Sequence, residues 1–232
     1  GFVLEDDDGT EVTINPAVSS GVYTAREVKF IGSGITTNWT DTSDGTDGDP
    51  YDLTFTNDII GKQSIWVPAT AMYPTNTGGC AAIALTETTA ARPDMYTLDF
   101  DASSDENAQF SVAFPSYWNE GTITYQAYWT TTATDTDGVA WSLAGVAVSD
   151  NDTIDVAFGT AVVVTDDALG AAEDLMVTAE SGAVTIAGSP AAGDLCYFNI
   201  ERDVSDANDD MAEDAKLIGI KLFYTIDDVH EA

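Results

Sequence analysis

The sequence predicts an all-β protein, and two observations carry that prediction. Short runs rich in Val, Ile, Thr, Tyr, Phe and Trp follow one another along the chain, and many alternate apolar with polar residues, as half-buried strands do. Polar breaks rich in Gly, Asn, Asp and Ser separate the runs. We predict a small N-terminal β module, residues 1–62, followed by a jelly-roll-like β-sandwich, residues 63–232.

The N-terminal module has short predicted strands joined by glycine-rich, strongly acidic turns. These strands are EVTI (Glu11–Ile14), REVKFIG (Arg26–Gly32), ITTNWT (Ile35–Thr40) and DLTFT (Asp52–Thr56). A module of about 60 residues has little core of its own. We therefore expect it to be stabilised by equivalent modules of other chains, which favours an oligomer.

After a seam at Asn57–Lys62 the predicted strands are longer and richer in aromatic residues. Their spacing, with turns such as NEG, TDTDG and SDND, is typical of a two-sheet sandwich of jelly-roll type. The strands are predicted at Ser64–Ala69, Met95–Asp101, Ala108–Phe114, Thr122–Thr132, Val139–Ser149, Thr160–Thr165, Ala183–Gly188, Asp194–Arg202 and Lys216–Ile226. One helix is predicted at Asp166–Val177, capped by Thr165, although Gly170 weakens it.

Composition limits the possible partners. Of 232 residues, 44% are hydrophobic, which is enough for a packed core. Seven Lys and Arg against 40 Asp and Glu give a formal net charge of −33. The electric field of such a negatively charged protein repels nucleic acids and anionic membranes, so we expect neither as a partner. The sequence contains no run of about eighteen apolar residues, so it predicts no membrane-spanning helix. The charge suits salt-rich water, where screening is strong.

Side chains for catalysis are scarce. The one histidine, His230, lies near the C-terminus, which argues against a Ser/His/Asp triad, and no His/Cys cluster suits zinc. Paired carboxylates can cleave glycosidic bonds, but among 40 acidic residues such pairs arise by chance. We predict a protein without catalytic residues or cofactor. Cys80 and Cys196 are far apart in sequence, and both a disulfide and two buried thiols are open.

The acidic stretch Asn38–Phe55 (NWTDTSDGTDGDPYDLTF) allows two interpretations. If the loop folds back, Asp44, Asp47 and Asp49 can converge on calcium, which prefers oxygen ligands. Alternatively, the stretch only connects two strands, with glycine and proline steering the turn. The same two interpretations apply to the second acidic run, Asp203–Asp214.

The segment Phe114–Thr132 concentrates aromatic side chains. It holds Tyr117, Trp118, Tyr125, Tyr128 and Trp129. In a strand, Tyr125 and Trp129 share one face and Tyr128 points to the other. Exposed aromatic rings can stack on sugars, so Tyr117, Trp118 and Trp129 are candidate contacts to a glycan or receptor. The alternative is packing in the core and at a subunit interface.

Two segments resemble proteins of marine tailed bacteriophages. The segment Gly9–Thr56 (GTEVTI…REVKFIGSGITTNWTDTSDGTDGDPYDLTFT) resembles a module of tail-fibre-like and other virion structural proteins. The segment Ser64–Thr225 (SIWVPATAMYP…LDFD…AQFSVAFPSYWNEGTITYQAYWTTT…DAKLIGIKLFYT) resembles a second virion-associated domain. The resemblance implies a non-enzymatic protein on the extracellular surface of the virion, associated as a homotrimer with other virion proteins. It carries no catalytic motif, so no active-site residues follow from it.

Several functions remain open at this point. The first is a fibre or spike that attaches to a host glycan or protein receptor. The second is a capsid decoration protein, with residues 1–62 as an arm along the shell. A glycan-cleaving enzyme and a surface protein of a salt-adapted microbe are the others. Because the chain begins at Gly1 and not at Met, we also expect it to be part of a longer protein.

Overall fold

The structure is a computed structural model that describes residues 2–5, 11–14, 35–40, 52–57 and 61–228. The chain divides into two compact units, Gly1–Ile59 and Ile60–Ala232. The boundary between them falls inside the seam predicted at Asn57–Lys62.

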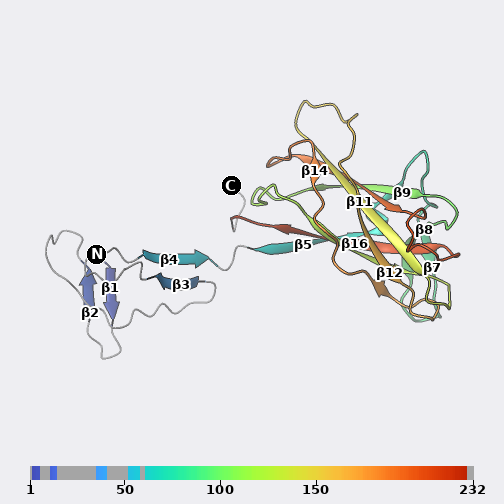
Figure 1. The fold of residues 1–232 in the computed structure, drawn as a ribbon, viewed down its shortest axis with the longest axis horizontal. Coiled ribbons are helices and arrows are strands. Elements are labelled where there is room, and N and C mark those ends of the chain that lie inside the picture. Colours follow the sequence, from blue (N-terminus) through green and yellow to red (C-terminus); the bar gives the residue numbers. More distant parts are fainter. Residues whose placement is uncertain (1, 6–10, 15–34, 41–51, 58–60, 229–232) are drawn as a thin grey trace. The chain divides into compact units, whose positions relative to one another are not determined.

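The first unit contains two separate antiparallel strand pairs (Figure 1). They are β1 (Phe2–Glu5) with β2 (Glu11–Ile14), and β3 (Ile35–Thr40) with β4 (Asp52–Asn57). The predicted strands at these positions are confirmed, whereas β1 was not predicted. The strand predicted at Arg26–Gly32 lies outside the described residues.

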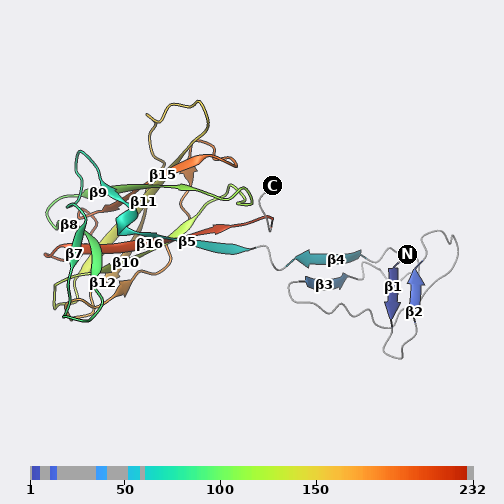
Figure 2. The ribbon, with the colours of Figure 1, turned by 180° about the vertical axis from the view of Figure 1, so that it is seen from behind.

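The second unit is a sandwich of two six-stranded sheets that lie face to face (Figures 1 and 2). The first, called the β16 sheet, has the order β13–β10–β16–β8–β7, and β5 also pairs with β16. Its strands are β5 (Lys62–Pro68), β7 (Ala84–Thr86), β8 (Met95–Phe100), β10 (Thr124–Thr130), β13 (Met176–Val177) and β16 (Ala215–Thr225). A short 3₁₀ helix, η1 (Ala69–Ala71), follows β5.

The second sheet, called the β11 sheet, has the order β12–β11–β15–β9–β6, and β14 also pairs with β11. Its strands are β6 (Tyr73–Pro74), β9 (Glu106–Ala113), β11 (Gly138–Val148), β12 (Val162–Asp167), β14 (Ile186–Ala187) and β15 (Leu195–Arg202). Pairing is antiparallel except between β11 and β14. The predicted all-β, jelly-roll-like sandwich is confirmed.

Strand alternation decides which side chains enter the core. On β15, buried and half-exposed residues alternate, so Cys196, Phe198, Ile200 and Arg202 point inward. The long strand β11 is buried throughout, and it pairs with β12 and β14 along one edge and with β15 along the other. The amino-acid pattern therefore specifies both the strands and their inner faces.

Aromatic rings fill the space between the sheets. The ring of Trp141 meets Phe100 edge to face at 5.1 Å and Trp129 at 6.5 Å between centroids. The Trp129 indole N–H donates to Asp166 Oδ2 (2.9 Å), and the Tyr125 hydroxyl lies 2.8 Å from the carbonyl oxygen of Trp141. These contacts join β10 of one sheet to β11 and β12 of the other, and they satisfy the polar atoms of Trp129 and Tyr125 within the core.

The helix predicted at Asp166–Val177 is wrong. Asp166 belongs to β12 and pairs with Val139 of β11, while its carboxylate accepts the Trp129 indole hydrogen bond. Gly170 has a φ of +84°, a conformation that does not continue an α-helix. Tertiary pairing overrides the local helix propensity here. Within the described residues there is no α-helix, and no helix is long and apolar enough to cross a membrane.

The two cysteines are separate thiols. Cys80 and Cys196 are free and buried, which confirms the second of the two alternatives. Burial raises the pKa of each thiol to about 12, assisted at Cys80 by the nearby Glu106 and at Cys196 by Asp194. Both side chains therefore act as small apolar groups, protonated at neutral pH.

Candidate functional site

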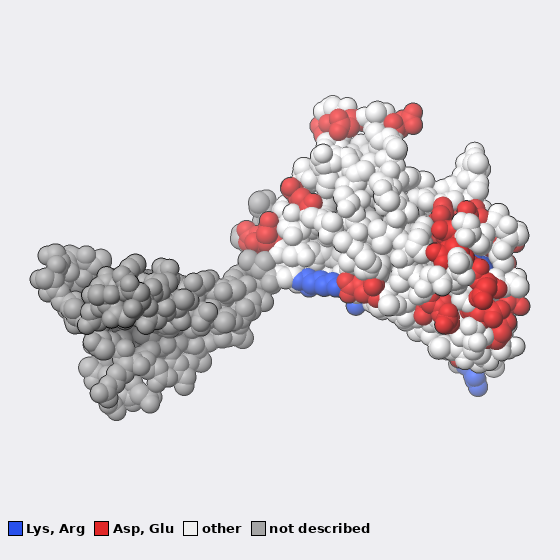
Figure 3. All heavy atoms as spheres, in the orientation of Figure 1, with Lys and Arg blue, Asp and Glu red and all other residues white. Residues whose placement is uncertain are grey.

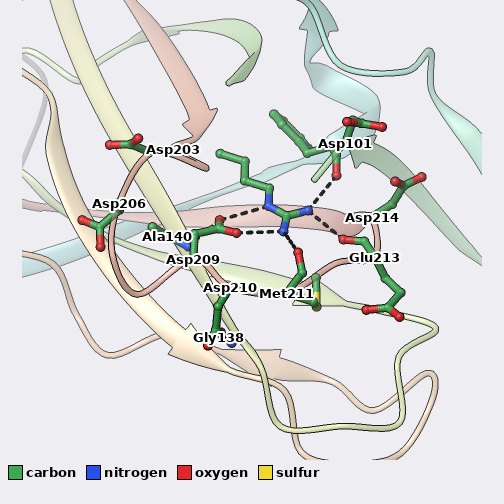
Figure 4. A network of polar contacts seen from close by, with 12 residues as sticks. Asp101, Gly138, Ala140, Asp203, Asp206, Asp209, Asp210, Met211, Glu213 and Asp214 are labelled. Atoms are coloured by element: carbon green, nitrogen blue, oxygen red, sulfur yellow. Dashed lines mark hydrogen bonds and ion pairs between the residues drawn. The ribbon is translucent and has the colours of Figure 1, made fainter. Parts of the chain in front are cut away.

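The acidic run Asp203–Asp214 encloses a buried arginine. The Arg202 side chain is fully buried, and Asp209 accepts a bidentate pair of hydrogen bonds from Nε (3.0 Å) and Nη2 (2.8 Å) (Figure 4). The remaining guanidinium hydrogens go to the carbonyl oxygens of Phe100, Met211 and Glu213 at 2.7–3.1 Å. All five donors of the guanidinium group are thus used.

Other aspartates of this run hold the backbone. Asp209 also accepts a hydrogen bond from the Ala140 amide (3.0 Å), and Asp210 accepts one from the Gly138 amide (2.7 Å). Asp203 and Asp206 point away from the guanidinium group and close local turns (Figure 4). In residues 61–228 no group of acidic, histidine or cysteine side chains is arranged to hold a metal ion. The contacts of Asp203–Asp214 therefore favour the second interpretation, a connection between two strands.

The first acidic stretch lies between β3 and β4. Asp44, Asp47 and Asp49, the proposed calcium ligands, lie outside the described residues. The strands on either side, β3 and β4, pair in register from Ile35 with Asn57 to Thr40 with Asp52. The predicted strand pair around the stretch is therefore confirmed, and calcium binding stays a prediction.

The predicted aromatic contacts lie mostly in the core. Trp129 is 0% exposed and Trp118 is 3% exposed, so neither ring can contact a glycan or receptor. Trp129 points inward on β10, and the ring of Trp118 packs 4.4 Å from that of Phe114. The assignment of these two residues to a ligand is corrected to core packing. Tyr117 is half-buried against the edge of the core.

The opposite face of the same strands is different. Directly paired residues of neighbouring antiparallel strands share a face, and the pairing of β16 with β5 and β10 places nine residues together on the outer face. We call them the Trp66 face: Ser64, Trp66 and Pro68 of β5; Gly219, Lys221 and Phe223 of β16; Thr124, Gln126 and Tyr128 of β10. It combines aromatic rings with polar groups that can form hydrogen bonds.

Gly219 fixes the position of the Trp66 ring. A Cβ at Gly219 would lie 2.7 Å from the Trp66 ring atoms and 2.6 Å from the Val67 carbonyl oxygen. The indole therefore lies across the backbone where a side chain is missing. Its neighbour Tyr128, paired with Gly219, meets it edge to face at 5.0 Å between centroids. Trp66 is 46% exposed, so one side of the ring is packed and the other is open to solvent.

Two lysines border this ring system. Lys221 is paired directly with Trp66 on one side and Gln126 on the other. Its Nζ lies 5.0 Å from the centroid of Phe223, and Lys62 Nζ lies 4.4 Å from the same centroid. Lys62 also forms an ion pair with Glu180, which lowers the pKa of that carboxyl group.

The outer face of the β11 sheet is occupied by an internal hydrogen-bond network. The Gln109 amide donates to Asn199 (3.4 Å), and the Asn199 amide donates to Asn107 (2.5 Å). Beside this row, burial raises the pKa of Glu201, and Asp105 and Asp203 add to the effect. These amides satisfy one another, so this sheet offers fewer free groups to a ligand than the Trp66 face.

The residues of the Trp66 face were not proposed from the sequence. Trp66 stands between Ile65 and Val67, which pack toward the core, and Tyr128 stands next to Trp129. Alternation within each strand therefore indicates that the rings of Trp66 and Tyr128 point outward. That the two rings lie on one face also depends on the order of the strands in the sheet, which alternation does not predict.

Comparisons with known proteins concern the fold. No family model and no curated protein matches this sequence. Solved structures similar to it include the CBM35 from Cellvibrio japonicus Abf62 (TM-score 0.38, 6% identity, covering 73% of this chain and 95% of that chain). Others are a family 35 carbohydrate-binding module from Clostridium thermocellum (0.38, 11%, 69% and 97%) and a family 11 module from the same organism, in complex with a β-1,3-1,4-mixed-linked tetrasaccharide (0.37, 8%, 70% and 95%). At these TM-scores and identities the similarity concerns the β-sandwich fold and not the ligand.

Proposed function

We propose that this protein is a non-enzymatic component of the bacteriophage virion surface, a fibre or spike whose sandwich binds a host glycan through the Trp66 face. The single observation that carries the binding part is the Trp66 ring, packed over Gly219 on one side and open on the other. The virion part is supported by the resemblance of Gly9–Thr56 and Ser64–Thr225 to phage proteins.

The chemistry of the face suits a sugar. The apolar side of a pyranose ring can cover the open side of the indole and remove apolar surface from water. Neighbouring Gln126, Lys221 and Thr124 supply polar groups for the hydroxyls, and Gln126 is itself held by a hydrogen bond to the Thr178 carbonyl oxygen (2.8 Å). One shallow site of this kind binds weakly. A homotrimer would present three sites and gain from multivalency.

The positions of the perturbed carboxyl groups support the non-enzymatic part. Burial raises the pKa of Asp166, but its carboxylate is engaged by the Trp129 indole between the sheets. The pKa of Glu201 is raised as well, and this residue lies on the β11 sheet. The pKa of Asp137 is raised too, and none of these three groups belongs to the Trp66 face, where a bound sugar would need an acid and a base. The carboxyl group that borders the face, Glu180, has a lowered pKa and is paired with Lys62.

The binding proposal is tested on an array of glycans and on surface polysaccharides from susceptible hosts. We expect the wild-type protein to be retained and Trp66→Ala to lose at least about tenfold in affinity, roughly 1.4 kcal/mol. The matched control is Tyr73→Ala, since Tyr73 is 48% exposed but lies on β6 of the other sheet. Equal retention of Trp66→Ala and wild type would refute the assignment of the face.

The virion proposal is tested by counting the copies of this chain in intact particles and locating them with labelled antibodies. A fibre or spike predicts a few dozen copies or fewer at the tail. Hundreds of copies over the head would instead indicate a decoration protein, and absence from purified particles would refute the virion role.

A further inference from the structure

Two of the few basic side chains of the sandwich, Lys62 and Lys221, border the Trp66 face. The described part of the sandwich has five basic side chains: Lys62, Arg92, Arg202, Lys216 and Lys221. Arg202 is buried, whereas the three lysines all lie on β5 and β16. On the face drawn in Figure 3, the largest group of carboxylates lies at one end of the sandwich, and the largest group of basic atoms lies near β5 with carboxylates directly beside it. In a chain of net charge −33, this placement creates a local exception.

The three lysines differ in how their charge is balanced. Lys62 is paired with Glu180, and Lys216 is paired with Asp99. Among the described residues, no carboxylate oxygen lies within 4.0 Å of Lys221 Nζ. Its ammonium group is instead held on the ring of Phe223. Lys221 is half-buried, so its ammonium group has already lost part of its hydration. A bound anion would replace the lost hydrogen bonds to water with hydrogen bonds to its own oxygen atoms.

Lys221 also lies in the right place to meet a substituent of a stacked sugar. It is paired directly with Trp66, and paired Cβ atoms of neighbouring strands are about 5 Å apart. We infer that the ligand of the Trp66 face is an anionic glycan, whose ring carries a carboxylate or sulfate group, and that Lys221 recognises that charge. This inference rests on the proposed function.

The large negative charge of the chain does not prevent such binding. At physiological ionic strength the Debye length is about 8 Å, and at 1 M salt it is about 3 Å. Under these conditions a bound anion responds mainly to the nearest charges, and the ammonium of Lys221 is in contact range. Association slows at low salt because of the net charge, but the bound contact is local.

The inference is tested by titrating the full chain with polygalacturonate and with its methyl ester, which has the same backbone without the charge. A second pair is dextran sulfate and dextran. We expect at least one charged polymer to bind about tenfold more tightly than its neutral counterpart. Lys221→Gln should remove that difference, and Lys221→Arg should retain most of it. Lys216→Gln, which alters a lysine already paired with Asp99, should keep the full difference.

The outcomes separate the inference from the proposed function. Preference for the uronate identifies a carboxylate ligand, and preference for dextran sulfate identifies a sulfate ligand. If charged and neutral polymers bind equally and Lys221→Gln changes neither, the anionic ligand is refuted while glycan binding stands. If no glycan binds, glycan binding by the Trp66 face and the anionic ligand are refuted together. If Trp66→Ala and Lys221→Gln only dissociate an oligomer, the face is an interface between copies, and both are likewise refuted. Melting curves confirm that each variant is folded.

Discussion

Arg202 and Lys221 are two cations on neighbouring segments of the same acidic chain, and their surroundings differ completely. Arg202 ends β15 and is 0% exposed, with every guanidinium hydrogen bonded to Asp209 or to a carbonyl oxygen. Lys221 lies on β16, half-buried beside aromatic rings, with no carboxylate partner within the described residues. A buried charge must be fully paired inside the protein, whereas a half-exposed one can keep its binding capacity for a ligand.

The Arg202 network shows that an acidic run can also stabilise the fold through buried hydrogen bonds. The guanidinium group contacts Phe100 of β8 in one sheet, while Asp209 contacts Ala140 of β11 in the other. The Asp203–Asp214 connection thereby ties both sheets together at one end of the sandwich. The side chains of the Trp66 face form no such link between the sheets, so truncating them should affect binding more than stability.

The largest effect is expected for Arg202→Met. Asp209, whose side chain is 2% exposed, would be left as an unpaired buried carboxylate, and three carbonyl oxygens would lose their donor. We expect a loss of about 3–5 kcal/mol in the free energy of unfolding, measured by urea unfolding with tryptophan fluorescence. Arg92→Met, at an exposed loop position, is the control and should stay within about 0.5 kcal/mol. Equal effects of the two variants would contradict the structural role of Arg202.

A smaller loss is expected for Gly219→Ala. The new Cβ would lie 2.6 Å from the Val67 carbonyl oxygen and 2.7 Å from the Trp66 ring, so the ring and backbone must shift. We expect about 1–3 kcal/mol of destabilisation together with weaker glycan binding. Gly61→Ala is the control, since nothing lies within 4 Å of a Cβ there. Unchanged binding by a folded Gly219→Ala protein would show that the ring position is not needed.

The next effect depends on pH and concerns Glu201, the neighbour of Arg202 on the opposite face of β15. Its pKa is raised by burial and by Asp105 and Asp203, so the folded protein binds this proton more tightly than the unfolded chain does. The ionised carboxylate therefore destabilises the fold above its folded pKa, and the penalty vanishes below the unfolded value of about 4.3. Glu201→Gln should stabilise by less than about 1 kcal/mol at pH 7 and by nothing near pH 4. Urea unfolding at both pH values checks this, and a constant loss at both would contradict it.

The smallest effect is expected for Lys62→Gln. The Lys62–Glu180 pair is exposed on both sides, at 49% and 37%, in contrast to the buried Arg202–Asp209 pair. Exposed pairs contribute about 0–1 kcal/mol, and salt screens them. We expect a change below about 0.5 kcal/mol in melting and urea experiments, falling further at 0.5 M NaCl. A loss comparable to that of Arg202→Met would refute the distinction between the two kinds of ion pair.

Much of the sandwich could be predicted because the pattern that favours a strand lies within a few consecutive residues. Each long strand shows a two-residue alternation that places one side in the core, as Tyr125 and Trp129 do on β10 and Phe198 and Ile200 do on β15. The very short strands β6, β13 and β14 lack such a pattern and were missed or overextended. The predicted helix failed because Asp166 pairs with Val139 of β11, a residue distant in the sequence, and because Gly170 adopts a positive φ.

The candidate site could be predicted only in part. The expectation that an aromatic ring on this sandwich meets a ligand remains, but the sequence alone cannot rank Trp66 above Trp118 or Trp129. Trp66 is flanked by Ile65 and Val67, whereas Trp118 and Trp129 each follow a tyrosine and precede a polar residue, so the flanking residues do not single out Trp66 as the exposed ring. Their exposure, 46% against 3% and 0%, depends on which side of each strand faces the second sheet.

The β-class, the seam before the sandwich and the acidic character could be read from the amino-acid sequence, because they follow from composition and from alternation within single segments. The sequence left the state of Cys80 and Cys196 open, and the structure shows two buried thiols. Three features became visible only in the folded chain: β5, β16 and β10 are neighbours, Gly219 lies beneath Trp66, and Asp209 pairs with Arg202. Such contacts depend on strand order and register between segments far apart in the chain. No local pattern specifies them, because each arises from the joint packing of two sheets.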